Sequence, residues 1–333
     1  LLIIFQRFSI QSKKLIIFKW SLIFPELCGF KERKLILFPL FLIMYILILV
    51  GNSMIIYLVR TDAKLNSPMY FFLHNLSFSD IIYTTTTVPN MLSGFLVEVK
   101  TISKAGCFTQ MYVFLSMGTT GRGLLTVMAF DRYLAICNPL RYTSVMTWKA
   151  RYLLILSAWA FGWFIPFKAL MLALPLPFCG PNIVKHILCD HTSVVRLACT
   201  DITINGVVAL TFALIALIST FLLILTSYIL IGKAISKMGS VERRKAAATC
   251  VSHLIVVTIS FSCATCVYIS YRVPSFDAEA RLIIAVLYSV LTPLLNPFIY
   301  SLRNKELQDA MKRAFCRSTS GSSMARKTVP SVS

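Results

Sequence analysis

The chain has 333 residues, of which 57% are hydrophobic and only 14% are charged, whereas soluble domains carry about 25% charged residues. Its formal net charge of +20 would suggest a nucleic-acid partner in a soluble protein. Here the apolar residues are gathered in long blocks, so the basic residues between them are interpreted as the flanks of membrane spans that meet anionic lipid. Composition therefore excludes an ordinary soluble domain and predicts an all-α membrane protein, with no nucleic acid among its partners.

The first 34 residues form an atypical segment. The apolar run at residues 15–24 is interrupted by Lys19, so it predicts neither a signal peptide nor a membrane span. The sequence also begins with Leu1 rather than Met. We therefore interpret residues 1–34 as a fragment or as an artefact of coding-sequence prediction.

Seven apolar blocks follow, and each is long enough to cross a bilayer, since a spanning helix needs about 20 mostly apolar residues. Irregular backbone is not tolerated against lipid, so helices are expected. The sequence predicts a seven-transmembrane helix bundle over residues 35–302 and a tail over residues 303–333. The predicted spans are residues 35–59, 68–93, 108–137, 152–173, 205–231, 246–271 and 282–302.

The distribution of Lys and Arg predicts the orientation of this bundle. With the C-terminus on the cytoplasmic side, the inner loops and tail hold eighteen basic residues and the three outer loops hold seven. Basic residues accumulate on the cytoplasmic side of membrane proteins, so we expect a cytoplasmic C-terminus and an N-terminus outside. The seven basic residues within 1–34 disagree with this orientation, and the sequence provides no physical reason for them.

Two stretches place charged residues where they are costly. The third span ends in MAFDRYLAICNPLRY, where Arg132 can be held by Asp131 or released toward a partner; an ordinary arginine that reaches the membrane surface is the alternative. In the second span Asp80 lies near mid-membrane, where ionisable groups are expensive and usually functional. Its natural polar partners are Asn52 and Asn296. Pro297 interrupts the helix backbone beside Asn296, which suits either a helix that shifts between two packings or a purely structural kink.

Several motifs occur together and in a fixed order. They are GN at Gly51, PMYFFL from Pro68, MAFDRY from Met128, SY at Ser227, RRKAAATCVSH from Arg243 and NPFIYSLRN from Asn296. From about Pro39 to Glu306 the chain resembles the vertebrate odorant receptors, a branch of the rhodopsin-like G-protein-coupled receptors. The resemblance implies a multi-pass plasma-membrane receptor that binds a small-molecule odorant. Such a receptor activates a stimulatory, olfactory-type heterotrimeric G protein and raises cyclic AMP. The resemblance implies neither enzymatic activity nor a cofactor.

The resemblance also implies roles for individual residues. The residues expected to serve activation and G-protein coupling are Asp131, Arg132, Tyr133, Tyr228, Lys245, His253, Asn296, Pro297 and Tyr300. An intramembrane polar network is expected from Asn52, Asp80, Arg122 and Asn296. It implies two disulfides, one between Cys107 at the outer end of the third helix and Cys189 of the long second outer loop, and one between Cys179 and Cys199 within that loop. A metal site at His186, Cys189 and His191 is the alternative.

The ligand of such receptors lies in the outer half of the bundle. Steps of three and four residues back from Arg132, with matching positions on the other helices, predict the lining residues Phe114, Leu115, Gly118, Thr119, Phe212, Ala216, Phe261, Ala264, Tyr268 and Ser289. This lining is apolar with a few hydroxyls, so a small, weakly polar ligand is expected. A charged ligand is not expected, because Phe114 stands where amine receptors have an Asp and residues 282–302 contain no Lys for retinal.

The chain departs from the family pattern in ways that bear on activity. Gly121 replaces a Glu, and Arg122 falls deep within the third span, where it is expected to pair with Asp80 or with backbone carbonyls. Phe261 and Ser262 stand where the family favours Tyr-Gly. These changes either retune activation or mark a diverged copy that does not signal.

Other expectations concern delivery and rival functions. No asparagine precedes Asn52, so the family's N-terminal glycosylation sequon is missing and poor surface delivery is expected. Cys316 is either palmitoylated or unmodified. The rival functions are a membrane transporter or channel, and a membrane enzyme built on the His186–His191 cluster or on Cys250 with His253.

Overall fold

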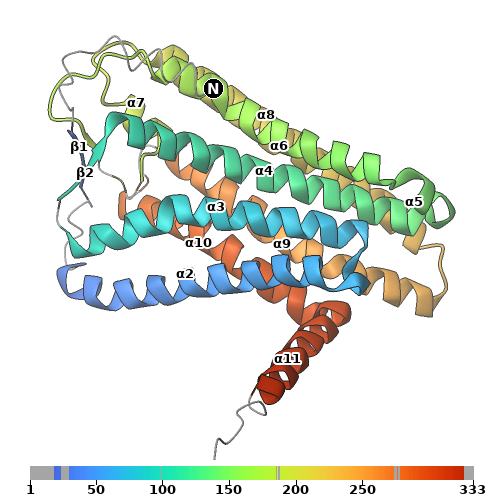
Figure 1. Cartoon of the computed structure of the whole chain (residues 1–333). Coiled ribbons are helices and arrows are strands. Elements are labelled where there is room, and N and C mark those ends of the chain that lie inside the picture. Colours follow the sequence, from blue (N-terminus) through green and yellow to red (C-terminus); the bar gives the residue numbers. More distant parts are fainter. Residues whose placement is uncertain are drawn as a thin grey trace, which may run out of the picture.

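A computed structural model describes residues 19–23, 30–97, 99–184, 186, 188–273, 276 and 278–325. Within these residues, seven long helices lie side by side in a bundle, with a small sheet at one end and a further helix leaving the other end (Figure 1). Each of the seven contains one whole predicted span, so the predicted seven-helix architecture is confirmed. The long helices are α2 (Phe30–Thr61), α3 (Pro68–Leu96), α4 (Lys104–Cys137), α6 (Trp148–Ala173), α8 (Thr203–Ile235), α9 (Ser240–Arg272) and α10 (Ala278–Arg303).

The apolar surface of the bundle is suited to lipid. Six helices of the described chain are long and apolar enough to cross a membrane; α3 is as long but does not reach the same hydropathy along a whole span. In the most apolar stretch of α8, only 17% of the residues are buried inside the protein, whereas in α4 the share is 61%. Since an exposed apolar helix must meet an apolar solvent, α8 faces lipid and α4 is the central helix, in contact with α3, α6, α8 and α9.

Local sequence determines where several helices begin. The Ser103 hydroxyl accepts a hydrogen bond from the Gly106 amide at 3.0 Å, which caps the first turn of α4. The Thr147 hydroxyl accepts one from the Ala150 amide at the start of α6. Such caps satisfy amides that have no partner within the helix. Proline begins both α3 and the short inner helix α5 (Pro139–Val145), where its missing N–H costs nothing.

The outer end of the bundle carries a three-stranded sheet. Its order is β2 (Val99–Ser103), β1 (Lys19–Ile23) and β3 (Ile183–Val184), with β1 antiparallel to β2 and parallel to β3. Part of the atypical N-terminal segment therefore pairs with the first and second outer loops. The remainder of residues 1–29 lies outside the described part of the chain. The short helix α7 (His191–Val195) follows in the second outer loop.

The sequence did not predict the helix at the inner end, α11 (Lys305–Ala325), which leaves the bundle at an angle (Figure 1). Leu307 and Ala310 are buried against the bundle core, as their spacing of three residues on one helix face requires. Arg313 forms an ion pair with Asp62, in the turn between α2 and α3, at 2.6 Å, and this guanidinium lowers the pKa of the Asp62 carboxyl. The sequence predicts only a tail over residues 303–333, although the apolar spacing of Leu307 and Ala310 is typical of such a helix.

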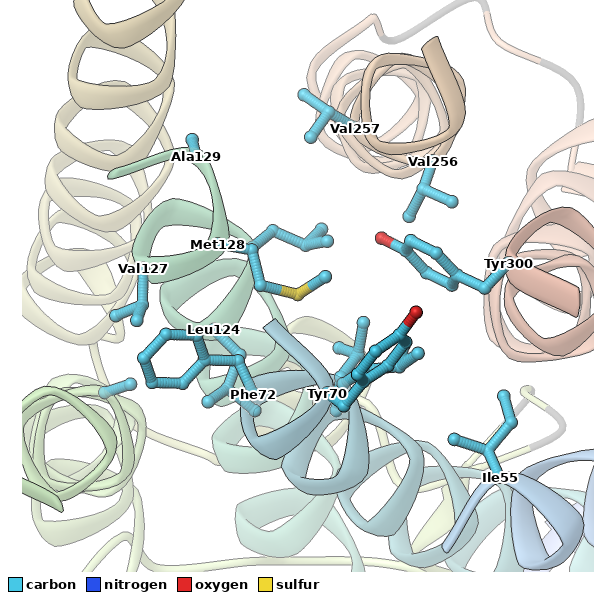
Figure 2. Packing of buried hydrophobic residues seen from close by; sticks show 14 of the residues in the cluster. Ile55, Tyr70, Phe72, Leu124, Val127, Met128, Ala129, Val256, Val257 and Tyr300 are labelled. Carbon is cyan, nitrogen blue, oxygen red and sulfur yellow. The ribbon is translucent and has the colours of Figure 1, made fainter. Parts of the chain in front are cut away.

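The largest core cluster occupies the inner half of the bundle, where side chains from α2, α3, α4, α9 and α10 meet (Figure 2). Figure 2 shows Tyr70 of α3 and Tyr300 of α10 directed into this cluster near Met128 of α4. Aromatic and sulfur-containing side chains fill an irregular gap well. This packing brings the inner ends of α4, α9 and α10 together.

The helices α4 and α6 approach each other through small residues. A Cβ added to Gly123 would lie 3.3 Å from the Cβ of Ala158, and one added to Gly162 would lie 2.8 Å from the Cα of Thr120. Small residues let the backbones of two membrane helices come close enough for extensive van der Waals contact. The contact holds the central helix against α6.

Candidate functional site

The inner end of α4 holds a buried ion pair. Arg132 donates from Nη2 to the Asp131 carboxylate at 2.6 Å and from Nε at 3.1 Å, and Tyr142 of α5 donates to the other oxygen of Asp131 at 2.7 Å. The Asp131 side chain is fully buried, and 14% of the Arg132 side chain is exposed. Burial and the neighbouring carboxylate raise the pKa of Tyr142, which keeps its hydroxyl a donor. Of the two arrangements that the sequence allows, the structure has Arg132 held by Asp131.

A second polar contact connects α8, α9 and α4 about two helical turns deeper in the bundle. The Tyr228 hydroxyl lies 2.8 Å from Nδ1 of His253, and Nε2 of His253 lies 3.0 Å from the Leu125 carbonyl oxygen. A carbonyl only accepts, so Nε2 carries the proton and Nδ1 accepts from Tyr228. His253 is therefore a structural hydrogen-bonding residue between three helices.

The other residues expected to serve coupling lie around this end of the bundle. Tyr300 is buried in the core cluster, Tyr133 packs against it half-buried, and Lys245 is exposed near the start of α9. Cys250 is also buried here. The basic inner end of α9 and the Arg132 ion pair thus lie at the same end of the molecule.

The polar residues at mid-bundle form separate contacts rather than one network. Asn296 donates to the Asp80 carboxylate at 2.7 Å, as expected for its natural partner. Asn52 instead donates to the Pro293 carbonyl at 3.1 Å and to the Ile48 carbonyl. The Pro293 carbonyl lacks the usual helical donor, because the residue four positions on is Pro297, and Asn52 satisfies it.

Arg122 does not make the contact that was expected of it. Its Nη1 donates to the Tyr288 hydroxyl at 2.9 Å and its Nη2 to the Thr119 hydroxyl at 3.2 Å. The expected pairing with Asp80 or with backbone carbonyls is therefore wrong. The side chain points outward along α4, because long side chains of a helix lean toward its N-terminus, and the N-terminus of α4 is its outer end.

A cavity of about 390 Å³ lies in the outer half of the bundle. Its walls come from α3, α4, α6, α8, α9, α10 and the second outer loop. The structure places eight of the ten predicted lining residues in this cavity. They are Phe114, Leu115, Gly118, Thr119, Phe212, Ala216, Ala264 and Tyr268.

The other two predicted lining residues lie elsewhere. Phe261 belongs to the inner core cluster and contacts the ring of Phe221 at 5.7 Å between ring centroids. Ser289 is buried with its hydroxyl bonded to the Val286 carbonyl, and its neighbour Tyr288 lines the cavity instead. Successive side chains of an α-helix point in directions about 100° apart around its axis. An error of one position in the prediction therefore exchanges a residue that faces the cavity for one that faces a neighbouring helix.

The second outer loop closes the cavity. The structure has both disulfides that the resemblance implied, Cys107–Cys189 and Cys179–Cys199. Cys189 is therefore not available as a thiolate for the alternative metal site. The first disulfide brings the loop back over the bundle, and His186, Asp190, His191 and Arg196 of this loop line the cavity. Helix periodicity does not extend to a loop, so the sequence did not predict that these loop residues line the cavity.

Lowering the pH below about 6.5 is expected to destabilise the packed outer loop. Burial lowers the pKa of both His186 and His191 from the usual 6.5, although the nearby Asp190 carboxylate opposes this effect. The unfolded loop thus binds protons that the folded loop does not, so stability falls as the pH falls from 6.5 toward the lowered pKa values. The measurement is the thermal unfolding midpoint of the purified receptor at about pH 7.5 and about pH 5.5.

The wild-type midpoint is expected to fall at the lower pH, and a double variant with His186→Gln and His191→Gln to show a smaller fall. If the unfolding midpoint fell equally in the two proteins, the loss of stability at low pH would not come from these histidines.

Comparisons with known proteins agree with this geometry. The chain matches the olfactory receptor family over residues 41–318. It is 43% identical to human olfactory receptor 10J1 over 293 residues, which cover 88% of this chain and 91% of that receptor. It is also 43% identical to human olfactory receptor 6N1, with 88% of this chain and 93% of that receptor covered.

Among solved structures, squid rhodopsin is similar in fold, with a TM-score of 0.64 and 18% sequence identity, over 90% of this chain and 93% of that one. Identity this low carries the fold alone, whereas the relatives at 43% identity carry the family. The chain belongs to the olfactory receptor family.

Proposed function

We propose that this chain is an odorant receptor of the plasma membrane, which binds a small molecule in the outer cavity and activates a heterotrimeric G protein at its inner end. It is a signalling receptor and not an enzyme. The observation that carries the proposal is that one central helix, α4, lines the cavity with Phe114 and Leu115 and also carries the Arg132 ion pair. A shift of α4 relative to α9 therefore affects both ends.

The mechanism is a shift between two packings of the bundle. With Arg132 held by Asp131 and His253 holding α9 against α4, the described arrangement is the resting one. A ligand that binds the other packing more tightly favours outward displacement of α9, release of Arg132 and exposure of the basic start of α9 to the G protein. Moving the populations from 1:99 to 99:1 needs a difference in ligand binding of about 5.5 kcal/mol between the two packings.

Replacement of Arg132 by alanine is expected to remove the cyclic AMP response while the receptor still reaches the cell surface. Among the described residues Arg132 pairs with its neighbour Asp131, and the buried Asp131 carboxylate keeps the hydrogen bond from Tyr142 after the change. Surface staining and cyclic AMP are measured together on an epitope-tagged receptor with an added leader, against a panel of volatile compounds.

The matched control is Arg60→Ala, which removes an exposed positive charge near the inner end of α2 and is expected to leave the response unchanged. A full response from Arg132→Ala at normal surface level would refute the role of Arg132. A wild-type receptor at the surface that raises no cyclic AMP with any compound would count against signalling and favour the diverged copy.

A further inference from the structure

We propose that Arg122 is a ligand-binding residue and that the outer cavity takes an odorant with one terminal carboxylate on an otherwise apolar body. The inference rests on the proposed receptor function and names the chemical class of the ligand. It replaces the expectation of an uncharged ligand. That expectation rested on the absence of the Asp of amine receptors and of the Lys that binds retinal, and neither absence bears on the positive charge of Arg122.

The guanidinium of Arg122 lies buried in the membrane part of the bundle. Only 5% of the residue is exposed, and Arg122 lies ten residues before Arg132 on the same helix, or roughly 15 Å toward the outer side. A buried positive charge is strongly unfavourable unless an anion or several hydrogen bonds compensate it. The position therefore requires a compensating partner.

The partners within the protein are few and neutral. They are the hydroxyls of Tyr288 and Thr119, and Nε of Arg122 has no hydrogen-bond partner in the described part of the chain. Among the residues that the structure describes, the ion pairs are Arg132–Asp131 and Arg313–Asp62, so Arg122 has no carboxylate within 4 Å. A guanidinium has five N–H donors, which leaves donors unused.

Two acids line cavities that Arg122 also lines, and each accepts hydrogen bonds from another residue. Asp80 accepts from Asn296 and lines, together with Arg122, a second and smaller cavity. Asp190 accepts from the amide and the hydroxyl of Ser193 in the outer loop. Neither carboxylate compensates the Arg122 charge directly, so an anion from outside the chain fits this position.

The cavity provides access to Arg122. Arg122 and its two partners all line the 390 Å³ cavity. At Gly118, one turn further out, a Cβ would lie 4.0 Å from Nη1 of Arg122 and 3.4 Å from the Tyr288 hydroxyl. Because glycine has no side chain, Gly118 does not narrow the approach from the cavity to the guanidinium.

The chemistry of the walls selects the rest of the ligand. Phe114, Leu115, Ile165 and Ala169 provide apolar surface, which favours a ligand with a hydrocarbon body. A carboxylate matches the fork of a guanidinium and accepts two parallel hydrogen bonds from it. An aliphatic or aromatic carboxylate with a body of moderate length satisfies both the walls and the cation.

Direct binding to the purified full-length receptor tests the inference without a G protein. The probes are octanoate, octanol and octylamine, which share one chain length and differ in the end group. Octanoate is expected to bind at least about ten-fold more tightly than octanol, because only the carboxylate forms a charge-assisted pair. Equal binding of octanoate and octanol, or a preference for octylamine, would overturn the inference.

Variants then locate the cation. Arg122→Gln is expected to lose at least about ten-fold in octanoate affinity and little in octanol affinity, with Arg122→Lys intermediate because it keeps the charge but not the fork. Arg196→Gln tests the rival cation, the exposed arginine that also lines the cavity. Loss of octanoate binding in Arg196→Gln but not in Arg122→Gln would refute the assignment. The wild-type comparison of probes needs no variant, so poor folding of Arg122→Gln leaves the inference testable.

Cyclic AMP separates this inference from the proposed function. A receptor that responds to neutral volatiles but binds octanoate no better than octanol keeps its function and refutes the inference. A receptor that binds octanoate through Arg122 but raises no cyclic AMP with any compound supports the inference and refutes the signalling role.

Discussion

Gly162→Ala is expected to prevent most of the receptor from folding and reaching the cell surface. The added Cβ would lie 2.8 Å from both the Cα and the Cβ of Thr120, and closer still to its hydroxyl oxygen. A backbone atom cannot turn away as a side chain does, so α4 and α6 must separate. Overpacking of a close-packed interior costs about 1–3 kcal/mol and more where the backbone is involved, and here it displaces the central helix. Surface staining and the thermal unfolding midpoint of the purified protein measure the loss.

The matched control is Gly232→Ala on α8, where an added Cβ has no neighbour within 4 Å. This change removes a glycine from a helix and is expected to be neutral or to stabilise by up to about 1 kcal/mol. Combining Gly162→Ala with Thr120→Gly removes the contacts with the threonine side chain and is expected to restore part of the stability. Normal surface level and an unchanged midpoint for Gly162→Ala would show that the two helices do not pack this closely.

Cys107→Ser is expected to abolish the ligand response and to reduce surface delivery. Cys107 and Cys189 are completely buried among Phe108, Met111 and Val194, and their disulfide fixes the outer loop over the cavity. Without it, His186 and Asp190 lose their defined positions in the cavity wall. The cyclic AMP dose–response curve, normalised to surface level, measures the effect.

Removal of the second disulfide by Cys199→Ser is the control. Cys179–Cys199 closes 20 residues, whereas Cys107–Cys189 closes 82, a difference of about 1 kcal/mol in loop-closure entropy. Both chain neighbours of Cys189, Leu188 and Asp190, line the cavity, whereas no chain neighbour of Cys179 or Cys199 does. A weaker response at a similar maximum is expected. If both variants lose the response to the same degree, the first disulfide has no special role in forming the cavity.

Much of this molecule was accessible from the sequence, because lipid imposes a simple rule on the chain. Apolar blocks of sufficient length must be helices, and all seven predicted spans lie within helices. The same rule makes Asp80 and Arg122 conspicuous, since a charge in a span needs a reason. Most of the cavity residues on α4 also followed, because helix periodicity counted from Arg132 places Leu115, Gly118 and Thr119 on one face.

Only the tertiary structure decided which neighbours those faces meet. Periodicity does not specify how far α9 and α10 are rotated, so it wrongly predicts Phe261 and Ser289 as cavity residues, although they pack elsewhere. The approach of Gly162 to Thr120 and the choice of Tyr288 as partner of Arg122 depend on distances between residues far apart in the chain. Sequence thus determined which segments lie in the membrane, because that depends on local composition, whereas the packing of the helices determined most of the contacts inside the bundle.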